Sequence, residues 1–156
     1  MRQVAQPVSK INEQIQRLVD RMIDVMIASC GIGLAAPQVG VGLRIVVMSL
    51  TGRKEDAEAF INPQLGDFHG SSETEEGCLS VPGIRAKVRR SAVCTLKAQD
   101  IDGNNIVMDM VDLAATCIQH ETDHLDGTIF LDRLSPISRL ACRKAIRELE
   151  QQYEKE

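Results

Sequence analysis

Apolar residues recur every three or four positions near the N-terminus, and this spacing predicts an amphipathic helix. The helix should span residues 11–29 and end before Gly31, because glycine commonly stops a helix. A glycine-rich loop over residues 31–42 should follow, and then the β-branched run 43–50 predicts a buried strand. The buried stripe of the helix would consist of Ile11, Ile15, Leu18, Met22 and Met26.

Shorter strands and turns should occupy the middle of the chain. Residues 60–63 predict a short strand stopped by proline, and the polar stretch 66–75 predicts a loop. Residues 77–81 predict an extended segment that ends at Pro82-Gly83. Alternation over residues 92–98 predicts a strand with one buried face.

A hairpin and two helices should complete the chain. Asp102-Gly103 is a strong turn signal that would lead residues 92–98 back into a strand over 106–111. Residues 113–125 contain no Gly or Pro and predict a helix, with Asp112 as its N-cap. Ser135-Pro136 should begin a last helix that runs to about residue 151.

Strands in the middle, with one helix before them and two after, predict an α+β fold. A length of 156 residues suits one domain over 1–156. The net charge of −4 provides no electrostatic footprint for nucleic acid or anionic lipid. Four cations lie within residues 85–90, but they alternate with apolar residues and predict a solvated strand face.

The cysteines and the apolar stretches predict a cytoplasmic location. Five cysteines are an odd number without paired spacing, which argues for a reducing compartment and against a disulfide framework. The first residues lack the apolar core of a signal peptide. Residues 25–43 carry no charge, but their four glycines, one proline and one glutamine exclude a membrane-spanning helix.

The candidate chemistry centres on His120 and His124, the only clustered histidines of the chain. Residues four apart share one face of a helix, so both imidazoles can bind one metal ion, with Glu121 as a general base. Two helical histidines can also simply pack or titrate at a surface. A catalytic site of this kind needs a third ligand, which the sequence around the motif does not supply, because Phe130 occupies the position of a downstream histidine.

Several residues are candidates for the third ligand. His69 is better explained as a solvated loop histidine, and Cys117 lies two helical turns from His124. Glu148 and Glu150 fit the solvated face of the last helix. Cys78 remains, and spacing alone does not decide whether it is a ligand or a small packing residue.

Three sequence blocks together resemble the signature motifs of peptide deformylase, in that family's order and approximate spacing. They are GIGLAAPQVG (31–40), EGCLS (76–80) and QHETDHLDG (119–127), with INPQL and LDRLSP as matching flanks. The resemblance extends from residue 4 to about 151 and implies mostly antiparallel strands packed around a central metal-site helix, with N-terminal and C-terminal helices. Family members usually carry a short extended segment before the stretch that matches residues 2–8; its loss here would either lower stability or indicate a misassigned start.

The resemblance implies a reaction and assigns its residues. Cys78, His120 and His124 would hold one divalent metal, iron(II) in first place, with zinc, nickel or cobalt as alternatives. Glu121 would act as general base and acid for a metal-bound water that removes the formyl group from N-formylmethionyl peptides and releases formate. The Gln38 side chain and the Leu79 backbone N–H would stabilise the oxyanion.

The resemblance also implies how the peptide binds. Ile32 and Gly33 match positions where the peptide pairs as an added strand, and Arg85 matches a residue near that edge, although a surface role suits it equally.

The helical spacing from His120 predicts the pocket for the methionine side chain. Leu113, Thr116 and Cys117 share the face of His120 and should line this pocket opposite Ile32, which is compatible with ordinary core packing.

The sequence leaves the role of Asp123 and three alternative functions undecided. Asp123 is either a carboxylate that steadies a ligand histidine or a solvated helix residue, and we expect Cys30, Cys94 and Cys142 to be packing residues. The alternatives to a deformylase are an HExxH metallopeptidase, a non-catalytic binder of formylated or nascent N-termini, and a cysteine hydrolase that uses Cys78 with His120. The expected partners are formyl-methionyl nascent peptides near the ribosome exit, without a nucleic-acid site or a membrane.

Overall fold

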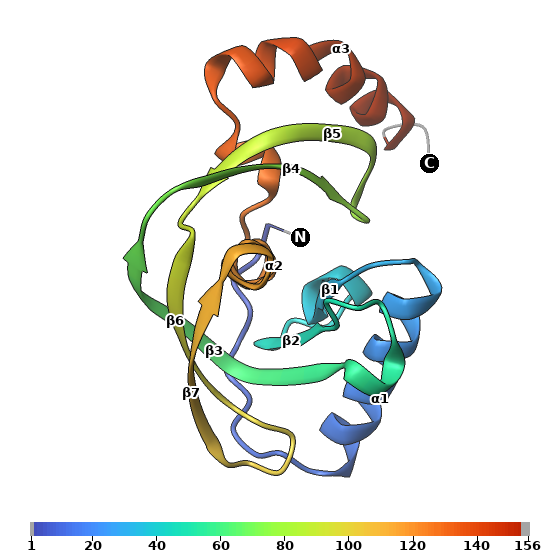
Figure 1. Cartoon of the computed structure of the whole chain (residues 1–156). Helices are drawn as coiled ribbons and strands as arrows, with labels where there is room; N and C mark the ends of the chain where they lie inside the picture. Colours follow the sequence, from blue (N-terminus) through green and yellow to red (C-terminus); the bar gives the residue numbers. More distant parts are fainter. Residues whose placement is uncertain (1, 154–156) are drawn as a thin grey trace.

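The computed structural model describes residues 2–153, which form an α+β fold of helices and antiparallel strands (Figure 1). The helices are α1 (Glu13–Ala28), α2 (Asp112–Leu125) and α3 (Pro136–Tyr153), and 3-10 turns lie at Ala36–Val39, Lys54–Asp56 and Phe130–Arg133. The strands are β1 (Gly33–Ala35), β2 (Ile45–Met48), β3 (Glu58–His69), β4 (Ser72–Cys78), β5 (Val81–Arg90), β6 (Val93–Gln99) and β7 (Asn105–Val111).

Two antiparallel sheets surround α2. One sheet has the strand order β1-β2-β3-β6-β7, and the other consists of β4 and β5. Figure 1 shows α2 end-on between the β4–β5 ribbon and the larger sheet, with α1 and α3 on the outside. This arrangement confirms the expected packing of strands around a central helix.

Strand β2 separates two hydrophobic clusters, which explains why all four of its residues are buried. Alternate side chains of a strand point to opposite faces of the sheet. Val46 and Met48 therefore belong to the cluster under α2, whereas Ile45 and Val47 belong to the cluster under α1. A third cluster joins β5 to α3 and the 3-10 turn before it.

The strands around the polar stretch differ from the expectation. Strand β3 does not stop at Pro63 but continues to His69, because a register shift between Ile61 and Gln64 removes the proline from the regular ladder. The predicted loop over 66–75 is instead the end of β3, a turn at Gly70, whose φ is +65°, and the start of β4. Most of its polar residues are exposed residues of strands rather than of a loop, and Ser72 and Thr74 are half-buried.

The segment after Cys78 also differs from the expectation. Pro82-Gly83 does not end an extended segment but lies inside β5, near its first residue, where proline disturbs the ladder least. Of the basic residues in this strand, Arg85 is exposed as expected, but Arg90 is buried. The expectation of a solvated strand face was therefore wrong for Arg90.

The helix boundaries agree with the sequence patterns, and the caps agree in part. The side chain of Asn12 accepts hydrogen bonds from the first amides of α1, so this helix begins at Glu13. Asp112 is not the N-cap of α2: it is the first helical residue, with a φ of +50°, and Val111 precedes the helix. The last helix begins at Pro136 as predicted.

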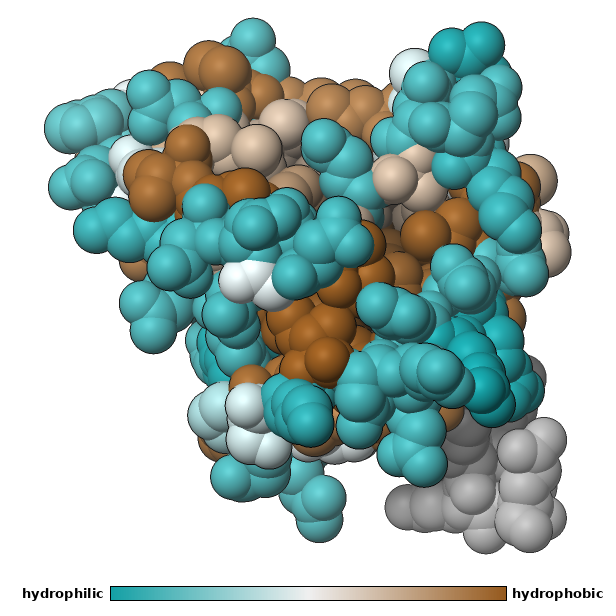
Figure 2. Space-filling model, turned by 90° about the horizontal axis from the view of Figure 1, so that it is seen from below, coloured by the Kyte–Doolittle hydropathy of each residue, from teal (hydrophilic) through white to brown (hydrophobic). Residues whose placement is uncertain are grey.

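The three cysteines that are not among the predicted site residues differ in their exposure. On the face seen from below, hydrophilic side chains surround and separate the hydrophobic ones (Figure 2). Cys94 is buried and Cys142 packs in the third cluster, but Cys30 is exposed, so a packing role is wrong for that residue. Within residues 2–153, no helix is both long and apolar enough to cross a membrane.

Candidate metal centre

The structure brings the side chains of Cys78, His120 and His124 together from two elements. Both histidines lie on α2, and Cys78 is the last residue of β4, at the turn into β5. The Nε2 atom of His124 lies 3.3 Å from Cys78 Sγ and 3.2 Å from His120 Nε2. One ligand atom from each residue fits within a span of 4.8 Å.

This geometry fits a metal ion. Tetrahedral bonds of about 2.0–2.3 Å place neighbouring ligand atoms roughly 3.3–3.6 Å apart, close to the observed separations. One thiolate and two imidazoles favour iron(II), zinc, cobalt or nickel over magnesium or calcium, which prefer oxygen ligands. Among the described residues, Cys78 is the candidate third ligand whose sulfur is grouped with the two imidazoles.

The two histidines differ in their protonation. Burial, together with the nearby His120, lowers the pKa of His124 to about 3, so that this imidazole is neutral at pH 7. Burial also opposes a charge on His120, but its hydrogen bonds to Cys78 and Glu76 outweigh burial and raise its pKa to about 10. Because a ligand nitrogen must be free of its proton, His120 would have to give up a proton to hold a metal ion.

Glu121 lies beside the three candidate metal ligands, and its side chain is buried. Burial raises the pKa of its carboxyl to about 7, and Oε2 is buried without a hydrogen-bond partner among the residues that the structure describes. Strand β1 approaches so closely that a Cβ atom at Gly33 would lie 2.7 Å from Glu121 Oε1 and 2.6 Å from Cys117 Sγ. Glycine at this position is what lets the strand edge reach the carboxylate.

Comparisons with known proteins identify the family of this chain. The family model described as polypeptide deformylase matches residues 1–140. The chain belongs to the polypeptide deformylase family. Solved structures of peptide deformylases from three organisms extend the likeness over almost the whole chain.

The deformylase from Legionella pneumophila is 39% identical with a TM-score of 0.88, covering 99% of this chain and 92% of that one. The deformylase from Plasmodium falciparum is 33% identical with a TM-score of 0.94, covering 98% and 91%. Deformylase 1B from Arabidopsis thaliana, in complex with an inhibitor, is 34% identical with a TM-score of 0.94, covering 99% and 87%. These deformylases share the fold of this chain, and the family consists of metal-dependent hydrolases.

A buried network of charges supports the metal centre of this deformylase. His120 Nδ1 lies 2.8 Å from Glu76 Oε2, and Glu76 in turn accepts two hydrogen bonds from the buried Arg90. Arg90 also donates to Asp123, which accepts two further hydrogen bonds from Arg133. Asp123 is therefore not solvated, and it reaches His120 only through Arg90 and Glu76.

The carboxylate that holds His120 in place is thus Glu76, for which the sequence patterns predicted no role. Its hydrogen bond fixes the imidazole of His120 with Nε2 toward Cys78 and His124. Arg90 and His120 counteract the effect of burial and lower the pKa of the Glu76 carboxyl, so the carboxylate is ionised at pH 7. The signal in the sequence was the position of Glu76, two residues before Cys78 on the same face of a strand.

Arg90 offers a test of this network, with its neighbour Arg89 as a matched control. Arg90→Met leaves the carboxylates of Glu76 and Asp123 buried with less compensating charge, which should lower the free energy of unfolding by about 3–5 kcal/mol. Arg89 is exposed and makes only a 4.0 Å ion pair with Glu73, so Arg89→Met should change it by less than about 0.5 kcal/mol. Urea unfolding of both variants makes the comparison, and equal losses would contradict the role of Arg90.

Gln38 lies on the other side of the centre in the 3-10 turn after β1. Its Oε1 accepts a hydrogen bond of 2.7 Å from the Ala35 amide, which directs the amino group toward Cys78 Sγ at 3.6 Å and Ser80 Oγ at 3.3 Å. Leu79 follows Cys78 in the turn between β4 and β5, and about half of its surface is exposed.

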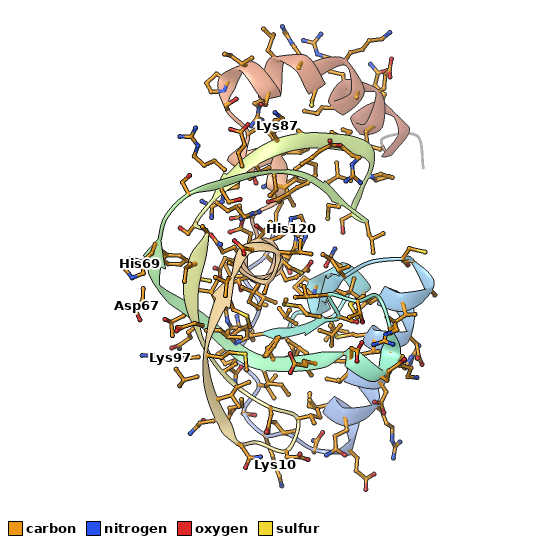
Figure 3. All side chains as sticks on the ribbon, viewed as in Figure 1. Lys10, Asp67, His69, Lys87, Lys97 and His120 are labelled. Atoms are coloured by element: carbon orange, nitrogen blue, oxygen red, sulfur yellow. The ribbon has the colours of Figure 1, made fainter. Side chains whose placement is uncertain are left out.

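The remaining predicted residues line one cleft of about 660 Å³ beside the metal centre. Arg85 lies at its exposed rim and pairs with Glu75 at 2.8 Å. His69 is far from this cleft: Figure 3 shows it at the outer end of β3, pointing away from the molecule, whereas His120 lies on the central helix. The predicted residues that line the cleft are Ile32, Gly33, Gln38, Leu79, Arg85, Leu113, Thr116 and Cys117.

Proposed function

We propose that this chain hydrolyses the formyl group from N-formylmethionyl peptides, with Cys78, His120 and His124 as the ligands of one divalent cation. The observation that carries the proposal is the meeting of these three ligand atoms in a cleft beside a buried carboxylate, whose Oε2 has no hydrogen-bond partner among the described residues. Membership of the deformylase family supplies the substrate class. A bound cation would supply Lewis-acid chemistry and make water acidic enough to be activated near neutral pH.

The donor set supports iron(II) as the cation, with nickel, cobalt or zinc as substitutes. A thiolate and two neutral imidazoles are soft or borderline ligands, which excludes magnesium and calcium in practice.

Glu121 is the group that moves the proton. As a carboxylate it accepts a proton from the attacking water, and as a carboxylic acid it delivers this proton to the amine nitrogen when the C–N bond of the formamide breaks. Oxygen from water thus ends in formate, and the peptide leaves with a free N-terminal amine. Its buried Oε2, which has no other hydrogen-bond partner among the described residues, is suited to this exchange.

Gln38 and Leu79 stabilise the negative charge that develops on the formyl oxygen. The hydrogen bond from Ala35 holds the carbonyl end of the Gln38 amide, so its N–H groups face the centre. Leu79 directly follows Cys78 and lines the same cleft as Gln38, which supports its backbone amide as the second donor.

The peptide binds along the free edge of β1. This strand is the outermost of its sheet and pairs only with β2, so the edge near Ile32 and Gly33 can add the substrate as another strand. Leu113, Thr116, Cys117 and Ile32 receive the first side chain, and Arg85 lies beside the following residues at the rim.

Formate release tests the function. The protein is prepared without oxygen, loaded with iron(II) or nickel(II) and given a formyl-Met-Ala-Ser peptide. We expect formate to appear in proportion to the loaded metal and a chelator to abolish it. Activity that survives complete removal of the metal would instead favour a cysteine hydrolase, and folded, loaded protein that releases no formate would contradict the proposal.

The setting of the reaction follows from the substrate. We place it in the cytoplasm, where formylated chains leave the ribosome. The five cysteines of the chain are all free of disulfides, in agreement with a reducing compartment.

A further inference from the structure

Two contacts join strand β4 to helix α2: Cys78 meets His124, and Glu76 meets His120. The second contact lies two residues earlier on the strand and four residues, about one turn, earlier on the helix. A further two residues earlier on the strand is Thr74, and a further four residues earlier on the helix is Thr116. We call these three pairs the first, second and third rung.

The third rung differs from the other two because its side chains do not bridge the space between strand and helix. Glu76 and His120 are long enough to join at 2.8 Å, whereas two threonines are shorter. Both Thr74 and Thr116 line the cleft beside the metal centre, together with the apolar side chains of Leu113 and Cys117. The space between the threonines is therefore part of the cleft.

Both threonine hydroxyls are buried and lack a hydrogen-bond partner in the part of the chain that the structure describes. Thr116 as a whole is only 6% exposed. A helical threonine can satisfy its hydroxyl with the carbonyl one turn earlier, but Thr116 makes no such hydrogen bond. A buried polar group that has no partner in the protein is suited to a partner on the ligand.

We propose that Thr74 and Thr116 select the first side chain of the substrate for a hydrogen-bond acceptor near its distal end. The inference rests on the proposed function, which places the formyl carbon at the metal ligands. The third rung lies one helical turn beyond His120, within reach of an unbranched side chain that extends from there. The methionine thioether is a weak acceptor, the sulfoxide of methionine is a strong one, and the hydrocarbon norleucine has none.

The chemistry therefore favours substrates with a polar sulfur substituent over their hydrocarbon counterpart. A site whose buried donors remain unpaired discriminates strongly against the ligand that lacks the acceptor. Removal of the hydroxyls should relax this discrimination and convert the cleft into a purely apolar pocket.

The test compares kcat/KM for three formyl peptides that begin with methionine, methionine sulfoxide or norleucine and continue with Ala-Ser. Thr116→Val and Thr74→Val should each lower the sulfoxide-to-norleucine ratio by about 5- to 10-fold, the size of one hydrogen bond. Thr116→Ser keeps the hydroxyl and should retain the wild-type ratio. Because each ratio is internal to one variant, losses of folding or metal loading cancel.

Thr122→Val is the matched control. Its hydroxyl is also buried without a protein partner among the described residues, and it lies on the same helix, but it lines a separate hollow that contains Asp123 and Arg133. The ratio should stay within 2-fold of wild type in this variant. Unchanged ratios in Thr74→Val and Thr116→Val, with formate still released, would overturn the inference alone, whereas no formate from any peptide would overturn the proposed function.

Discussion

Glu121→Gln is expected to reduce kcat by about 10²–10⁴-fold, the range that a positioned general acid or base contributes. The amide keeps the size of the carboxylate but cannot accept a proton from water or return it to the leaving amine. The three ligands keep their places, so metal content should remain at the wild-type value. Formate release and metal analysis on the same sample separate these two quantities.

Glu148→Gln is a suitable control, because Glu148 is an exposed residue of α3 that pairs only loosely with Lys144. It should leave kcat unchanged. A Glu121→Gln protein that retains more than a tenth of the wild-type kcat would contradict the general-base role.

The pH dependence gives a second measure of Glu121. Burial raises the pKa of its carboxyl to about 7, and the charge of a bound cation moves this value downward. The carboxylate is the active base, so kcat should rise with pH and level off at or below about pH 7.

The contribution of Glu121 to the stability of the protein without metal should change with pH in the opposite sense. The folded state binds the Glu121 proton more tightly than the unfolded state, whose carboxyl titrates near 4.5. This contribution falls by up to about 3 kcal/mol as the pH rises from about 4.5 to 7, whereas the contribution of His124, whose pKa is lowered, rises over part of the same range. The free energy of unfolding of wild type relative to Glu121→Gln should therefore fall over this range, because His124 is common to both proteins.

The sequence predicted those parts of the fold that depend on local spacing. The helical period placed α1 within two residues of its observed bounds, and the spacing of His120 and His124 put both imidazoles on one face of α2. The hairpin at Asp102-Gly103 formed as expected, because a two-residue turn signal between alternating strands has few alternatives.

Spacing patterns could not predict the contacts between residues that lie far apart in the sequence. Strand β4 is polar and contains Gly, so its composition does not distinguish it from a loop. Alternation predicted a strand face for residues 85–90 of β5, but Pro82-Gly83 hid the start of that strand. Glu76 and Arg90 are 14 residues apart, and only the pairing of β4 with β5 brings them together under His120. Cys78 remained as a candidate after the other residues were weighed, and the resemblance to deformylases assigned it as the ligand; the structure has its sulfur 3.3 Å from His124 Nε2.

Cys78→Ala is expected to lower the metal content from about one ion per chain to well below one, and formate release with it. The substitution removes the only thiolate of the centre and leaves two imidazoles, too few for the three protein ligands of a stable catalytic site. Metal analysis after dialysis and the rate of formate release would both report the loss.

Cys94→Ala provides the comparison for this variant. Cys94 is also a cysteine in a strand, but it is buried in the cluster under α2 and is not among the grouped ligand atoms. Its replacement should cost some stability and leave metal content unchanged. If Cys78→Ala retained metal at the level of Cys94→Ala, the sulfur would not be a ligand, and His120 and His124 would have to share their ion with another donor of the cleft.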